Sequence, residues 1–163
     1  MKELPENELD PRVKNVWRIN DATWITILFL CFLIPVLIMR GRPALQDTAD
    51  MLLIVVLVCY AAFMIVWLVI LPPIRYIRWR YQVSGEYLDI AKGIIWRNRI
   101  VIPFIRVQNT DTRQGPILRA FGLASVTVST AAGEHEIPGL DAQAAEKLRD
   151  RAAELARIAR EDV

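Results

Sequence analysis

The chain has 163 residues, of which 54% are apolar, and its formal net charge is +2. This length accommodates one domain of about 100 residues plus an anchor, which argues against a multidomain enzyme. The apolar excess lies almost entirely before residue 75, and such a distribution excludes an ordinary soluble domain.

The charged residues are also unevenly distributed along the chain. Residues 75–119 carry nine basic and three acidic side chains, whereas the segments before and after them carry more acidic than basic ones. This basic block directly follows the second of two long apolar runs. Cys31 and Cys59 lie inside these runs, without the spacing of a metal site or a disulfide framework, so we interpret both as small buried hydrophobic residues.

Two uncharged runs predict transmembrane helices. As a helix, Ala22 to Met39 would extend about 27 Å and Met51 to Ile74 about 36 Å, compared with a hydrocarbon core of about 30 Å. Pro35 removes one backbone hydrogen bond and clashes with the preceding turn, so a kink or an early helix end is expected near Ile34. The second helix is expected to end at Ile74. No secretory cleavage site follows the first run.

The short loop between the two runs predicts an antiparallel hairpin of neighbouring helices. Basic residues near the helix ends indicate its orientation, because positive side chains favour the cytoplasmic side. The outer ends have more of them than the loop, so both termini are predicted to be cytoplasmic, with residues 1–21 as a cytoplasmic segment and 22–74 as the hairpin. The residues counted are Arg12, Lys14 and Arg18 before the hairpin, Arg75, Arg78 and Arg80 after it, and Arg40 and Arg42 in the loop.

From Trp79 onward the continuous apolar run gives way to alternation bounded by turn residues, which predicts strands with one buried face. The expected strands are residues 80–83, 87–92, 94–102, 105–112, 125–130 and 135–137. A short helix or turn at 117–121 follows Gly115-Pro116, and Gly122 can close it as a left-handed cap. These elements predict an antiparallel roll or barrel.

The last segment predicts an amphipathic helix at about residues 141–161, with Asp141 as its N-cap. Small and apolar residues recur at three- and four-residue spacing and form one stripe, while charged residues occupy the outer face as a solvated surface. The stripe consists of Ala145, Leu148, Ala152, Leu155 and Ala159.

Pleckstrin-homology (PH) folds have the same order of elements, with strands followed by one amphipathic helix. Three stretches, RYQVSGEYLDIAKGIIWRNRIVIP at 80–103, RVQNTDTRQGPILRAFGLASVTVSTAAG at 106–133 and EIPGL at 136–140, resemble the YdbS-like bacterial PH-domain family. The two preceding transmembrane helices fit that family's usual layout. The resemblance implies a membrane-anchored α+β protein of the bacterial inner membrane: a two-helix transmembrane hairpin, then residues 75–163 as a PH-like antiparallel β roll with a C-terminal amphipathic helix.

The resemblance also singles out residues for which structural roles are favoured over partner binding. Gly115 and Gly122 permit positive backbone angles, and Phe121 is expected to plug the core. Asp111 is expected to pair with Arg106 or Arg113, and Gln108 can satisfy backbone groups at a strand edge. The family-specific residues are Arg106, Gln108, Asp111, Gln114, Gly115, Pro116, Arg119, Phe121 and Gly122.

Few residues indicate chemistry. His135 lies between Glu134 and Glu136 and is interpreted as a surface residue. Zinc, P-loop and dinucleotide motifs are absent from the sequence, so no catalysis, metal or cofactor is expected. PH domains that bind phosphoinositides carry several basic residues in and beside the first hairpin turn, where this chain has Ser84-Gly85-Glu86, so recognition of that kind is not favoured.

The basic block predicts contact with the anionic headgroups of a phospholipid bilayer, because it lies next to the second apolar run. Nucleic acid is disfavoured, since aromatic residues between the charges are sparse and Trp96 is the main candidate. The residues expected at the membrane surface are Arg75, Arg78, Arg80, Arg97 and Arg99.

Three functional hypotheses remain open. The first is a non-catalytic, membrane-tethered interaction or scaffold module that binds a protein partner or a second copy of itself, as a subunit of a membrane assembly. The second is a module that senses or handles anionic lipid at the inner leaflet. The third, implied by the family, is an accessory role in envelope stress or antimicrobial-peptide resistance through a partner membrane protein.

Overall fold

The computed structural model describes residues 5–161, which form two compact units. One unit comprises Trp17–Pro73 and is almost entirely helical. The other combines the residues up to Val16 with those from Ile74 onward and contains all the described strands. Two apolar helices therefore precede antiparallel sheets and a C-terminal helix, which is the predicted order of a transmembrane hairpin and a PH-like domain.

Two helices of the chain are long and apolar enough to cross a membrane. The first continues through Pro35 to Arg40, so the early end expected near Ile34 is wrong, and proline is tolerated there as it is in many transmembrane helices. The second extends past Ile74 to Arg78. In chain order the elements are α1 (Val13–Arg40), a 3₁₀ turn (Pro43–Leu45), α2 (Gln46–Ile65), a π-helical segment (Val66–Ile70) and α3 (Leu71–Arg78).

The π-helical segment ends at Ile70, and only Leu71 separates it from the Pro72-Pro73 pair of α3. The carbonyl of Leu68 would accept from the N–H of residue 72 in an α-helix or of residue 73 in a π-helix, and neither proline has an N–H. Arg18 Nε of α1 donates to this carbonyl at 2.9 Å instead. Because an unpaired carbonyl is costly within a bilayer, this hydrogen bond both satisfies the backbone and joins the two helices.

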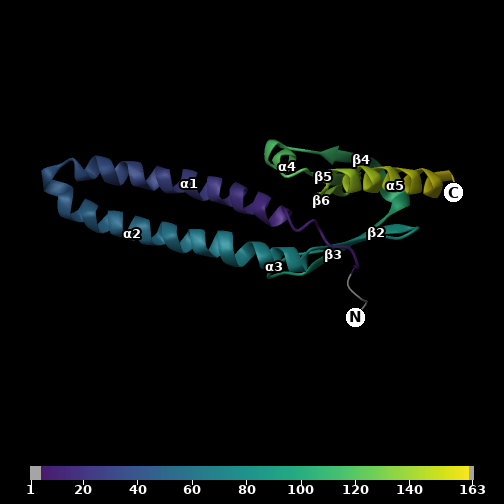
Figure 1. The fold of residues 1–163 in the computed structure, drawn as a ribbon, viewed down its shortest axis with the longest axis horizontal. Coiled ribbons are helices and arrows are strands. Elements are labelled where there is room, and N and C mark those ends of the chain that lie inside the picture. The colour runs from purple at the N-terminus through teal and green to yellow at the C-terminus, as the bar shows by residue number, and fades with distance from the viewer. Residues whose placement is uncertain (1–4, 162–163) are drawn as a thin grey trace. The chain divides into compact units, whose positions relative to one another are not determined.

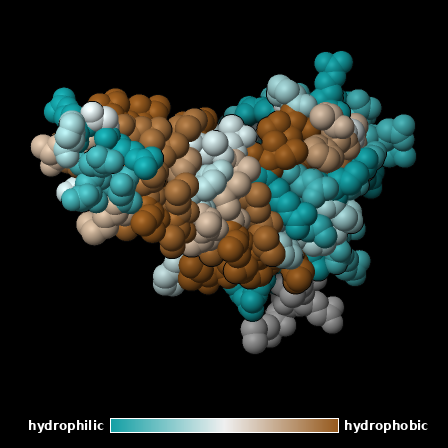
Figure 2. Space-filling view, turned by 60° about the vertical axis from the view of Figure 1, so that its left-hand side comes forward, coloured by the Kyte–Doolittle hydropathy of each residue, from teal (hydrophilic) through white to brown (hydrophobic). Residues whose placement is uncertain are grey.

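Large apolar side chains cover the outside of the helical unit, which is the brown surface in Figure 2. Trp24 is 66% exposed and Ile54 is 64% exposed. Cys31 and Cys59 are exposed as well, so the expectation that both are buried is wrong. Between the helices, the ring of Tyr60 stacks on Phe29, and its hydroxyl lies 3.3 Å from Thr26 Oγ1. Outward apolar and inward polar groups are typical of helices packed in lipid.

The second unit contains two three-stranded antiparallel sheets, ordered β1-β2-β3 and β4-β5-β6 (Figure 1). The helix α5 packs against the second sheet, and a 3₁₀ turn joins β3 to β4. The bounds are β1 (Arg80–Val83), β2 (Tyr87–Lys92), β3 (Asn98–Pro103), the 3₁₀ turn (Phe104–Arg106), β4 (Val107–Arg113), α4 (Pro116–Ala120), β5 (Leu123–Thr130), β6 (Gly133–Asp141) and α5 (Ala142–Glu161).

The predicted strands are all present, but β6 extends beyond the expected residues 135–137 at both ends, and β3 starts later than expected. It begins at Asn98 and not at Ile94, because the chain turns sharply after Lys92 and Gly93 has a φ of +116°. A residue with a side chain rarely adopts this angle, so glycine allows the turn. Residues 93–97 therefore form a loop between β2 and β3.

The core of the β unit is apolar and built partly as predicted. Phe104 is fully buried and fills the role expected of Phe121, which is only half-buried. In α5 the small side chains of Ala145 and Ala152 face inward and allow close packing. The backbone N–H of Gln143 donates to Asp141 Oδ1 at 3.1 Å, which confirms the predicted N-cap.

The two family-specific glycines differ in conformation. Gly122 has a φ of +65°, and this confirms the left-handed cap predicted at the end of α4. Gly115 has a φ of −73°, so a positive angle is not the reason for glycine there.

Residues 5–16 pack with the β unit, although the sequence indicated a separate N-terminal segment up to residue 21. Asn7 and Tyr81 exchange two backbone hydrogen bonds of 3.0 Å. The N–H of Asp10 donates to the carbonyl of Gly139 at 3.1 Å. Val13 is fully buried against Gly139, where an added Cβ would lie 2.0 Å from Val13 Cγ2. The absence of a side chain at 139 thus lets the N-terminal segment dock.

Candidate functional site

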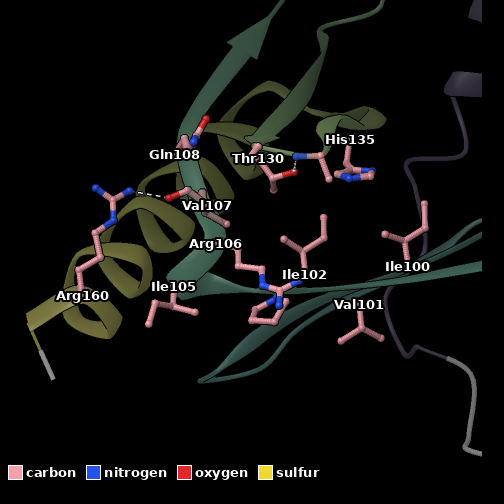
Figure 3. A pocket seen from close by; sticks show the side chains of 13 residues that line it. Ile100, Val101, Ile102, Ile105, Arg106, Val107, Gln108, Thr130, His135 and Arg160 are labelled. Carbon is pink, nitrogen blue, oxygen red and sulfur yellow. Dashed lines mark hydrogen bonds between the residues drawn. The ribbon is translucent and has the colours of Figure 1, made fainter. Parts of the chain in front are cut away.

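A groove of about 720 Å³ in the β unit lies beside the junction between its two sheets. Its walls come from β3, the 3₁₀ turn, β4, the β5–β6 turn and the end of α5 (Figure 3). The β5–β6 turn is fixed by Thr130, whose hydroxyl donates to the Gly133 carbonyl at 3.1 Å and accepts from the Ala132 N–H at 3.2 Å. The groove is therefore formed by regular elements and one tight turn.

Apolar side chains form the base of this groove. Ile100 and Ile102 point from β3 toward Thr130 and His135, while Val101 points to the opposite side (Figure 3). This alternation is the ordinary consequence of the two-residue period of a strand. Ile102 is almost fully buried, whereas Ile105 of the 3₁₀ turn is 47% exposed. The groove thus offers an apolar surface that is partly accessible from solvent.

The polar residues at the groove are basic or neutral. Arg106, Gln108, His135 and Arg160 line it, and none of the described lining residues is acidic. Arg160 Nη2 donates a hydrogen bond to the carbonyl of Val107, which holds the end of α5 on β4. These two guanidinium groups contribute a positive potential to the groove. It suits an apolar ligand that also carries negative charge.

The groove also borders an open sheet edge. In the order β1-β2-β3, and among the strands of residues 5–161, β3 pairs with β2 on one side only. An edge strand presents backbone N–H and C=O groups that another extended segment can pair with. Because residues Ile100 to Pro103 of β3 line the groove, apolar side chains and available backbone groups occur together.

The family-specific residues fall at opposite ends of β4. Arg106 and Gln108 lie at its start, in the groove. Asp111 lies within the strand, and the others lie beyond its far end, around α4, where Gln114 Nε2 donates to the carbonyl of Leu123 at 2.8 Å. The backbone-bonding role expected of Gln108 is thus performed by Gln114. The residues at the far end are Gln114, Gly115, Pro116, Arg119, Phe121 and Gly122.

The ion pairing expected of Asp111 is wrong. Its Oδ2 accepts from Asn109 Nδ2 at 2.8 Å, and Arg113 instead pairs with Glu134 across the sheet at 3.5 Å. Residues two apart on a strand share a face, which places the Asn109 amide beside Asp111, while Arg106 belongs to the 3₁₀ turn that precedes the strand.

Two of the five arginines predicted at the membrane surface form ion pairs within the β unit. Arg99 binds the buried carboxylate of Asp89 at 2.6 Å, and this hydrogen bonding raises the pKa of Arg99. Arg80 pairs with Glu8 at 2.7 Å and donates to the carbonyl of Trp79 at 2.9 Å. Their charge is therefore partly neutralised inside the unit. The other three predicted arginines, Arg75, Arg78 and Arg97, are exposed.

Arg12 forms a cluster of charges with two acidic residues, and this cluster was not predicted from the sequence. Its Nη2 contacts Asp10 at 2.8 Å and Asp141 at 2.9 Å, and its Nη1 donates to the carbonyl of Phe121 at 3.0 Å. These hydrogen bonds lower the pKa of both carboxyl groups. The order Asp10-Pro11 was the available signal, since an acidic cap followed by proline is typical of a helix start.

The architecture defines a class of protein: a transmembrane hairpin that carries a PH-like domain. In agreement with this, a family model described as "Bacterial PH domain" matches residues 24–156, so the match includes the hairpin as well as most of the β unit. The chain belongs to this bacterial PH domain family. It is 36% identical to the UPF0699 transmembrane protein YdbS of Bacillus subtilis (strain 168), over 163 residues that cover 100% of both chains. No solved structure matches the chain significantly.

Proposed function

We propose that this protein is a non-catalytic, membrane-tethered interaction module and a subunit of a membrane protein assembly. The observation that carries the proposal is the open edge of β3 beside the groove. An extended segment of a partner protein would add to this edge as a fourth strand. Its backbone would pair with β3, and its apolar side chains would occupy the groove next to Ile100 and Ile102.

The charges at the groove favour a partner segment with acidic residues. Arg106 is exposed at one side, Arg160 lies at the end of α5, and the part of the lining that the structure describes contains no carboxylate. Complementary charge raises the association rate and discriminates against basic segments. The partner is therefore expected to present alternating apolar side chains with at least one acidic residue nearby.

Site-specific photocrosslinking in the full-length protein tests this proposal. A photoreactive phenylalanine analogue at Ile105, which lies in the groove, should crosslink to a membrane protein or to a second copy of this chain. Ile158 of α5 is the matched control, because it is exposed as well, at 38%, and lies outside the groove. Arg106→Glu should abolish the crosslink at 105, whereas Arg149→Glu on the outer face of α5 should not.

Three results would overturn the proposal: no adduct at 105, equal adducts at 105 and 158, or an adduct at 105 that persists in Arg106→Glu. The first would indicate that the groove has no protein partner. The second and third would indicate collision without a defined site.

We further propose that the β unit and both termini lie in the cytoplasm of a bacterial cell, with the hairpin in the inner membrane. The support is the excess of basic residues at the outer ends of the hairpin over Arg40 and Arg42 in its loop. Cysteine at position 42, in a background of Cys31→Ala and Cys59→Ala, should react with an impermeant maleimide added to spheroplasts. Cysteine at position 143 should react only after lysis, and the reverse pattern would contradict this orientation.

Recognition of a lipid headgroup in the manner of phosphoinositide-binding PH domains has less support. That mode uses basic residues in the first hairpin turn. Here the β1–β2 turn contains Ser84, Gly85 and Glu86, and the carboxylate is exposed. An acidic side chain would repel a phosphate at this position.

A further inference from the structure

The loop between β2 and β3 presents two bulky apolar side chains to solvent. Ile95 is 85% exposed and Trp96 is 81% exposed, the highest values among the large apolar residues of the described chain. Even the outward-facing residues of the helical hairpin are less exposed, with Trp24 at 66%. Adjacent residues of this kind at a loop tip contribute nothing to the core of the β unit.

The loop is a tight turn that holds these side chains outward. Lys92 and Asn98 are the last paired residues of β2 and β3. Gly93 has a φ of +116°, and a Cβ there would lie 1.9 Å from the carbonyl oxygen of Trp96. The chain thus folds back onto Gly93, which only glycine permits. The turn directs Ile95 and Trp96 away from the sheet.

The strand register places this loop at the end of the sheet where the chain arrives from the second membrane-spanning helix. Ala91, at the end of β2, pairs with Arg80, the first residue of β1. Only Trp79 separates Arg80 from the end of α3 at Arg78, so β1 follows almost directly on α3 along the chain. The β1–β2 turn with Glu86 lies at the opposite end.

The charges near the two ends of this sheet also differ. Arg97 follows Trp96 in the loop, and the exposed Arg78 lies at the end of α3. The opposite turn instead carries the exposed Glu86. Anionic headgroups attract the first arrangement and repel the second. An indole ring has an apolar body and one polar N–H, which suits the boundary between headgroups and acyl chains.

We propose that the β2–β3 loop is a second membrane-binding site, which inserts Ile95 and Trp96 into the headgroup region of an anionic phospholipid bilayer. Arg97 contacts the phosphates beside them. The covalent connection through α3 supplies one attachment of the β unit, and the loop supplies another. Together they limit its rotation and fix the direction in which the groove faces. This inference needs the membrane span but not the partner proposed above.

Spin labelling of the full-length protein tests the insertion. In a Cys31→Ala, Cys59→Ala background, Ile95→Cys receives a nitroxide, and Glu86→Cys at the opposite turn is the matched control. The protein is reconstituted at low density in vesicles of phosphatidylglycerol and phosphatidylethanolamine. Collision rates are then measured with oxygen, which concentrates in the bilayer, and with a water-soluble nickel chelate.

At position 95 we expect oxygen to relax the label more than nickel does, and at position 86 the opposite order. Equal, high accessibility of both labels to nickel would overturn the proposal. Protection at 95 that increases with the number of protein copies per vesicle would also overturn it, because a second copy would then cover the loop. Quenching by bromine-labelled lipid gives an independent readout: the emission of Trp96, obtained as the difference between the spectra of wild type and Trp96→Phe, should be quenched, and an unquenched difference would contradict insertion.

Discussion

The two units of this protein place similar residues on opposite sides of their folds. In the helical unit, large apolar side chains such as Ile54 lie outside, and the hydrogen bond from Arg18 to Leu68 lies between the helices. In the β unit, Phe104 and Leu88 are buried, while the outer face of α5 is charged. Each unit therefore suits a different solvent, lipid for the helical unit and water for the β unit. Water drives apolar groups inward, whereas lipid leaves helix association to packing and polar contacts.

The largest expected effect is a difference between the two units when a phenylalanine in each is replaced by alanine. Phe104→Ala removes a ring that is 0% exposed and leaves a cavity, so the β unit should lose about 3–5 kcal/mol of unfolding free energy. Phe32→Ala is the matched control, because Phe32 is 59% exposed on α1 and faces lipid. Denaturant unfolding of full-length protein in mild detergent, followed by near-ultraviolet circular dichroism, measures both. Comparable losses would contradict the division into a water-facing and a lipid-facing fold.

The polar contact inside the hairpin should have a smaller effect. Arg18→Leu leaves the carbonyl of Leu68 without the 2.9 Å hydrogen bond, and we expect a loss of about 1 kcal/mol in helix association, the range typical of polar contacts between transmembrane helices. Pro72→Ala restores an N–H four residues after Leu68. Arg18→Leu should therefore cost less in that background, as measured by the temperature dependence of hairpin protection from proteolysis in bicelles.

The double-mutant comparison distinguishes this bond from other roles of Arg18. If Arg18→Leu costs the same with proline or alanine at 72, the arginine does not act through the unsatisfied carbonyl. The polar interior of the hairpin would then depend more on Tyr60 and its neighbours.

The sequence predicted elements whose signals are local. Two long uncharged runs, alternation after Trp79 and the Asp141 cap each depend on neighbouring residues, and the structure contains the helices, strands and cap that they predict. The docking of residues 5–16 was missed because it depends on Gly139, more than 120 positions away. The role of Phe104 was missed for a similar reason, since burial of a single aromatic depends on which sheets meet around it.

The groove was predictable only in part. Arg106 and Gln108 were identified as family-specific residues, but their sequence neighbours Asp111 and Gln114 lie farther along β4 or beyond it. Conversely, His135 was interpreted as a surface residue and Arg160 was not singled out, yet both line the same groove as Arg106. A strand separates residues that are close in sequence, and a sheet joins those that are distant, so a site of this kind requires the tertiary structure.

The smallest expected effect concerns the charges that attach the N-terminal segment to the β unit. Arg12 lowers the pKa of Asp10 and Asp141 below the ordinary value of about 3.9. A carboxyl group with a lowered folded-state pKa stabilises the fold fully above its unfolded pKa and loses that contribution as pH falls through the folded value. Below about pH 4, the N-terminal segment should therefore open more often. Hydrogen exchange of the Asn7 and Asp10 amides, which bond to Tyr81 and Gly139, would report this opening.

Arg12→Gln provides the control for this pH dependence. It removes the cation that both carboxylates contact, so the variant should exchange these amides faster at neutral pH and change little on acidification. The amide of Ala142, which bonds to the carbonyl of Gly122, lies next to Asp141 but outside the N-terminal segment and serves as the internal reference. Wild-type protein whose Asn7 and Asp10 exchange is unaffected below pH 4 would show that apolar burial of Leu9 and Val13 alone holds the segment. The N-terminal segment would then be held mainly by the exclusion of apolar side chains from water, as the core of the β unit is.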